Sequence, residues 1–201
     1  MKTFHRPEGA WLSEQAFSAL QREYTELWNR IEDLRATSPW NYPALQNQAM
    51  LLKFFLEQAF GSGDPPRGDT LRVLERDFGG IEGFAVLWHE AAARAGVDWL
   101  VLGLSFADFR FHLFPVGSGS PPIPFCVSPI FCACMRGDVV ERSGLSRDGF
   151  ARAQWEHLGW SAVEDRLVCL TLPLDVFDEP ADCVTESCAA ESLAVGASDV
   201  A

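Results

Sequence analysis

Six cysteines are the residues of this chain best suited to bind a metal or form disulfides. They follow no C-x-x-C spacing, the usual sign of a zinc or redox pair. One residue separates Cys132 from Cys134, which would place both on the same face of a strand. Free thiols in a reducing compartment are therefore expected, and a zinc site is the alternative, although it lacks a second ligand pair. The six are Cys126, Cys132, Cys134, Cys169, Cys183 and Cys188.

Four histidines are the other candidate ligands or proton-transfer groups. They are His5, His89, His112 and His157. His5 lies near the N-terminus, the other three fall in separate predicted elements, and residues 6–88 contain none. The H-E-x-x-H, G-x-S-x-G and Gly-rich phosphate-binding patterns are also absent from the sequence. We therefore expect ordinary surface or hydrogen-bonded histidines rather than a catalytic cluster.

The formal net charge of −12 is unevenly distributed. Residues 171–201 contain seven Asp or Glu residues and no Lys or Arg, which leaves −5 on residues 1–170. An acidic chain repels phosphate backbones, so extensive nucleic-acid contact is disfavoured. No apolar run reaches the roughly 18 residues of a membrane helix. The first residues lack the apolar stretch of a secretory signal, and a removed mitochondrial presequence remains compatible with them.

Two helices are predicted near the N-terminus. Residues 12–35 carry one apolar stripe at three- and four-residue steps, with Ser13 as the candidate N-cap. Prolines within residues 37–43 end that helix, and residues 44–60 form a second helix that is apolar on most sides. The short connection predicts an antiparallel hairpin, and the Gly/Pro-rich loop 61–69 marks its end.

Further helices are predicted on both sides of a strand region. Residues 70–77 form a short helix, residues 78–80 (Phe-Gly-Gly) interrupt it, and residues 81–95 form a longer one. Residues 148–166 return to helical periodicity at the end of the folded part. Helices thus precede and follow the strands.

Three strands are predicted between these helices. They are residues 99–102, 109–114 and 125–134, and Arg110 and His112 would share one face of the second. The order of elements predicts an α+β fold with a three-stranded antiparallel sheet.

Two blocks of this sequence resemble the iron/manganese superoxide dismutase family. Residues 74–84, LERDFGGIEGF, and the later Asp98-Trp99-Leu-Val are similar to its DFGS-x-E-x-F and W-x-W-L-V signatures. Residues 155–167, WEHLGWSAVEDRL, resemble its terminal block W-N-x-(L)-V-N-W-x-x-V-x-x-R-L. The resemblance implies an N-terminal helical hairpin and a C-terminal α/β dismutase-like domain, followed by an acidic tail that matches nothing in the family. The corresponding ranges are residues 1–62, 66–168 and 171–201.

The chemistry of that family needs a redox metal held by three histidines and one aspartate. The resemblance places the four ligand positions at Leu20, Leu52, Cys132 and Arg136. Leucine has no donor atom, and arginine cannot lose its proton to bind a metal. The resemblance therefore implies no catalytic residue, no metal and no cofactor, with leucines filling the former metal cavity. Arg136 would reach the surface or pair with Asp138 or Glu141.

The resemblance implies a structural role for this chain. Metal-free dismutase-like proteins are subunits of the small subunit of mitochondrial ribosomes, so we expect such a subunit in the mitochondrial matrix, contacting proteins and little RNA. Met135 replaces a glutamate that crosses the family's dimer interface, and a homodimer or a heterodimer with a dismutase-like chain is expected. The alternatives are a free-standing pseudoenzyme acting as a dimeric binding or regulatory module, and an enzyme with unusual ligands such as Cys132 and Cys134.

Overall fold

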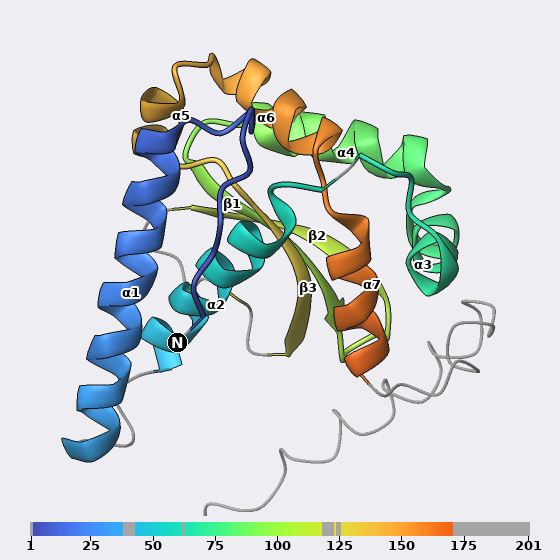
Figure 1. The fold of residues 1–201 in the computed structure, drawn as a ribbon. Helices are drawn as coiled ribbons and strands as arrows, with labels where there is room; N and C mark the ends of the chain where they lie inside the picture. The colour runs from blue at the N-terminus through green and yellow to red at the C-terminus, as the bar shows by residue number, and fades with distance from the viewer. Residues whose placement is uncertain (1, 38–42, 62, 118–122, 124–125, 171–201) are drawn as a thin grey trace, which may run out of the picture. The chain divides into compact units, whose positions relative to one another are not determined.

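The computed structural model describes residues 2–37, 43–61, 63–117, 123 and 126–170 (Figure 1). The predicted acidic tail 171–201 lies outside the described residues, as do Cys183 and Cys188. No helix in the described ranges has the length and apolar character needed to cross a membrane.

Two helices begin the fold, as the sequence predicts. Helix α1 spans Glu14–Thr37 and α2 spans Pro43–Gln58, and the two pack against each other. The Oγ of Ser13 accepts a hydrogen bond from the amide of Ala16 at 3.2 Å, which confirms Ser13 as the N-cap of α1. The apolar stripe of α1 faces the interior, because its buried residues recur at helical spacing. These residues are Ala16, Phe17, Leu20, Tyr24 and Ile31.

Helices α3 (Gly68–Phe78) and α4 (Ile81–Ala93) are separated by a turn of two glycines. Gly79 has φ of 72° and Gly80 has φ of 109°, a region that residues with a side chain rarely adopt. The predicted interruption at residues 78–80 is therefore confirmed. It lets α4 leave at an angle to α3 and pack on the sheet.

The sheet contains three antiparallel strands in the order β2-β1-β3. Strand β1 (Val97–Ser105) is central and buried almost throughout, while β2 (Phe111–Gly117) and β3 (Val127–Cys134) form the edges. The register between β1 and β3 shifts where Leu102 pairs with Phe131 and Gly103 pairs with Pro129. This irregularity and the edge position accommodate the proline, which has no amide hydrogen to donate.

Strand β2 begins later than predicted. Arg110 lies in the preceding turn, where its amide donates to Oδ1 of Asp108 at 3.1 Å and its carbonyl accepts from Ser105 at 2.9 Å. Phe109 has a positive φ of 54°, which interrupts the extended conformation. The prediction that Arg110 and His112 share a strand face is therefore wrong.

Three helices follow the sheet where one was predicted. They are α5 (Gly137–Ser143), α6 (Arg147–Glu156) and α7 (Trp160–Cys169). The helical conformation is interrupted at His157–Gly159, because Gly159 passes close to the residues that follow α2. A Cβ added to Gly61 would lie only 2.3 Å from the Cα of Gly159. Helix α5 was missed because seven residues are too few for an apolar period to be recognised.

Aromatic rings fill the space between the sheet and helices α4, α6 and α7. Trp88 lies 5.2 Å from Phe131 between ring centroids, Phe84 lies 5.8 Å from Trp155, and Trp155 lies 5.9 Å from Trp160. Fully burying a ring such as that of Phe84 or Phe131 stabilises the fold by roughly 1.5–3 kcal/mol. Figure 1 shows α2 and α7 in front of the sheet, with α1 beside it. The α+β architecture with a three-stranded antiparallel sheet is confirmed.

Candidate functional site

The four positions that the dismutase resemblance assigns to metal ligands lie on α1, α2 and β3 and at the N-cap of α5, and α2 packs against both α1 and β3. Leu20 of α1 is 1% exposed, and Leu52 of α2 and Cys132 of β3 are 0% exposed. The Sγ of Cys132 lies 3.0 Å from the carbonyl oxygen of Leu51, next to Leu52. Helix α1 reaches the end of β3 through Glu23, which follows Leu20 by three residues and contacts Arg136. The side chains at these positions pack as core or form an ion pair.

Arg136 is the charged member of this set. Its Nη1 lies 2.8 and 2.7 Å from the two carboxylate oxygens of Glu23, and its Nε and Nη2 each lie 3.1 Å from the carboxylate of Asp138. Burial alone would lower the pKa of Arg136, but the bonds to Glu23 and Asp138 raise it above its ordinary value. The guanidinium therefore stays charged and donates hydrogen bonds, a role opposite to that of a metal ligand.

The structure corrects the predicted surroundings of Arg136. Asp138 is confirmed as a partner, whereas Glu141 forms no ion pair within the described part of the chain. Glu23 was missed, because 113 residues separate it from Arg136 and no local spacing links them. Gln48 approaches the same carboxylate, with Nε2 at 3.5 Å from Oε1 of Glu23.

Cys132 and Cys134 both have fully buried side chains. Burial raises the pKa of Cys134 to about 12 and raises the pKa of Cys132 further. Metals and electrophiles bind the thiolate, so both groups are unreactive at neutral pH. Cys126 and Cys169 are free and exposed. Among the residues that the structure describes, no group of three or more His, Cys, Asp or Glu side chains could hold a metal ion.

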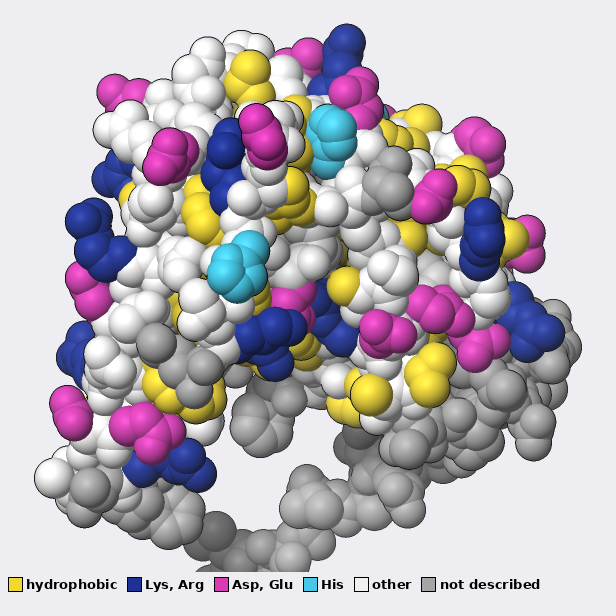
Figure 2. Space-filling view, in the orientation of Figure 1, with side chains coloured by type: hydrophobic (Ala, Val, Ile, Leu, Met, Phe, Trp, Pro, Cys, Tyr) yellow, Lys and Arg dark blue, Asp and Glu magenta, His cyan; other side chains and the backbone are white. Residues whose placement is uncertain are grey.

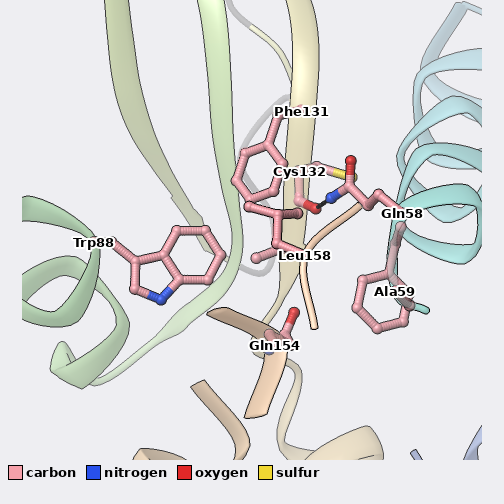
Figure 3. A pocket seen from close by; sticks show the side chains of 9 residues that line it. Gln58, Ala59, Trp88, Phe131, Cys132, Gln154 and Leu158 are labelled. Atoms are coloured by element: carbon pink, nitrogen blue, oxygen red, sulfur yellow. Dashed lines mark hydrogen bonds between the residues drawn. The ribbon is translucent and has the colours of Figure 1, made fainter. Parts of the chain in front are cut away.

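The outer edge of β3 is covered by side chains instead of another strand. The carbonyl oxygen of Cys132 accepts from Nε2 of Gln58, as the dashed line in Figure 3 shows. The carbonyl of Cys134 accepts from Gln154 at 2.8 Å, and that of Ile130 accepts from Arg166 at 3.0 Å. Each buried carbonyl of this edge is thereby satisfied, which keeps it from pairing with other chains.

Arg166 of α7 connects this edge to α2. Its Nη1 lies 2.9 Å from Oε1 of Gln58, its Nη2 lies 2.8 Å from Oε2 of Glu57, and its guanidinium lies 4.0 Å from the ring centroid of Phe54. Burial would raise the pKa of Glu57, but hydrogen bonds from Lys2 and Arg166 outweigh burial and lower it. Arg166 therefore joins α2, β3 and α7 into one unit.

A small cavity lies beside this edge, between α2, α4, β3 and α6 (Figure 3). Its volume for a water-sized sphere is about 10 Å³, which is enough for one water molecule at most. The indole nitrogen of Trp88, which lines it, is buried and has no hydrogen-bond partner among the described residues. The cavity leaves no space for an organic substrate. Its other lining residues include Gln58, Phe131, Cys132, Gln154 and Leu158.

Met135 is placed differently from the expectation of an interface residue. Its side chain is 0% exposed, and its Sδ lies 3.5 Å from Nε2 of Gln154. A dimer contact of this chain would therefore use residues other than Met135.

Gln58 and Gln154 are two further residues that sequence reasoning missed. Both are buried on helices whose other buried residues are apolar, and an isolated buried amide indicates a hydrogen-bond partner. Neither residue is in a recognisable motif. No known protein family and no curated protein matches this sequence. The function is therefore inferred from these residues and their contacts.

Proposed function

We propose that this chain is a non-catalytic structural subunit built on the iron/manganese superoxide dismutase fold. Its assembly is the small subunit of the mitochondrial ribosome, in the mitochondrial matrix. The order of elements supports this proposal, because a helical hairpin, two further helices, a three-stranded antiparallel sheet and terminal helices follow one another. The two sequence blocks that resemble the family lie in α3–α4 with β1, and in α6–α7.

The replacement of the ligand positions carries the argument. Leu20 and Leu52 are core side chains without a donor atom, and Cys132 is a buried protonated thiol. Arg136 forms ion pairs with Glu23 and Asp138. A redox metal needs deprotonated nitrogen, oxygen or sulfur donors, so these residues do not fit one. Hydrophobic packing and an ion pair in place of ligands favour a role in assembly.

The charge of the chain indicates how it would be held in such an assembly. A net charge of −12 disfavours a position surrounded by ribosomal RNA and favours contacts with proteins. A second dismutase-like chain, identical or different, is the proposed direct partner. The subunit would then lie at the periphery of the assembly. Its contacts would weaken at high salt where they depend on the acidic charge.

Sedimentation of mitochondrial extracts tests the proposal. The native protein should migrate with the small ribosomal subunit, and the purified protein should contain iron, manganese and zinc only far below one atom per chain. An antibody to a large-subunit protein serves as the fractionation control. Migration only as a free protein or a small dimer would assign the chain to a free-standing pseudoenzyme. Stoichiometric metal would contradict the non-catalytic role.

A further inference from the structure

The outer face of α4 combines apolar and acidic side chains. Val86 is 57% exposed and Leu87 is 44% exposed, although the opposite face of the same helix is buried against the aromatic core. Glu82 and Glu90 are exposed on the outer side of the same helix. We call these four residues the α4 face. Large apolar side chains exposed together on a helix are typical of an interaction surface.

A groove between α4 and α6 adjoins the α4 face. Its volume is about 210 Å³, and three alanines supply much of its lining: Ala92, Ala93 and Ala151. His89, one turn after Val86 on α4, lies at the same groove. Small lining residues leave space for an inserted apolar side chain.

The guanidinium of Arg147 at this groove donates its hydrogen bonds to backbone carbonyls of the chain itself. Arg147 donates to the carbonyls of Ala92 and Met135 at 2.8 and 2.7 Å, and to that of Val97 at 2.7 Å. Asp148, also at the groove, pairs with Arg152 at 3.2 Å. Arg147 keeps its positive charge, but its donors are occupied by these carbonyls, so the groove offers an incoming side chain mainly the apolar contact of its alanines.

The α4 face itself carries two carboxylates and no cationic side chain. Neither Glu82 nor Glu90 forms an ion pair within the described ranges, and residues 1–170 carry a net charge of −5. Figure 2 shows acidic, basic and apolar side chains mixed at the upper right, in the region where Figure 1 places α4. A complementary surface would present Lys or Arg around an apolar residue.

We propose that the α4 face and the adjoining groove are the docking site of a basic amphipathic helix from another protein. An apolar residue of that helix enters the groove beside Val86, and its Lys or Arg residues pair with Glu82 and Glu90. This inference rests on one part of the proposed function, namely that the chain binds another protein. It does not depend on the dismutase resemblance.

A designed peptide of roughly 15 residues, with leucines on one helical face and lysines elsewhere, is the probe. Its binding to the full chain is measured by fluorescence anisotropy at low and high salt. The Val86→Ser variant should weaken binding roughly tenfold, while Val168→Ser, which changes a valine 61% exposed on α7, should leave it unchanged. Glu90→Gln should also weaken binding, in contrast to Glu26→Gln on the exposed side of α1.

Equal effects of the variants and their matched controls would overturn the proposal, as would equal binding of a peptide with glutamates in place of lysines. Self-association that Val86→Ser abolishes, seen by analytical ultracentrifugation without peptide, would also overturn it by assigning the face to a second copy. Failed peptide binding with normal sedimentation in the small ribosomal subunit would overturn the docking face alone. Specific peptide binding by a protein that never migrates with that subunit would overturn the ribosomal assignment alone.

Discussion

Arg136 at the start of α5 holds both carboxylate oxygens of Glu23 in α1, at 2.8 and 2.7 Å from its Nη1. The contact joins α1 to the N-cap of α5, just after β3. Both side chains are partly buried, with 22% and 27% exposure. Losing one partner leaves a partly desolvated charge, which costs more than losing an exposed pair.

The Glu23→Ala variant should therefore lower the free energy of unfolding by about 1–2 kcal/mol. Glu26→Ala, in the same helix, should have almost no effect, because its pair with Arg22 is 4.0 Å apart and mostly exposed. Urea denaturation followed by circular dichroism measures both. Equal destabilisation by the two variants would show that the Arg136 contact contributes nothing specific.

The amide of Gln58 is expected to be essential for the β3 edge. Gln58→Leu leaves the buried carbonyl of Cys132 without its donor and removes one acceptor from Arg166, so stability should fall by about 1–3 kcal/mol. Gln46→Leu places the same change at an exposed position of the same helix and should be nearly neutral. Thermal unfolding of the two variants beside the unmodified chain provides the comparison. A stable Gln58→Leu protein would contradict the assigned role.

Glu57 should make the free energy of unfolding decrease as the pH falls into the acid range. Its pKa is lowered from the ordinary 4.5 in the folded chain, so its contribution is present above about pH 4.5 and is lost as pH falls through the folded pKa. The stability difference between the unmodified chain and Glu57→Gln should be largest near neutral pH and shrink in acid. Chemical denaturation at a series of pH values measures it. A difference that grows as the pH falls would reverse the proposed sign.

Thiol labelling should separate buried from exposed cysteines. Iodoacetamide treatment of the native protein should alkylate Cys126 and Cys169, because both are exposed. Cys132 and Cys134 should react only after unfolding, since both are buried and hold their protons. Peptide mass spectrometry before and after denaturation gives the extent at each position. Rapid native labelling of Cys132 would indicate an accessible site and contradict the packed core.

The sequence alone determined most helices and strands, because these depend on local periodicity. It predicted the break at Gly79–Gly80 and the cap at Ser13 for the same reason. It also determined which residue types occupy the positions that the resemblance assigns to metal ligands. The tertiary structure decided which distant groups meet: Glu23 with Arg136, and Gln58 with Cys132. Those contacts join residues more than seventy positions apart, so only the packing of α1 against α5 and of α2 against β3 could bring them together.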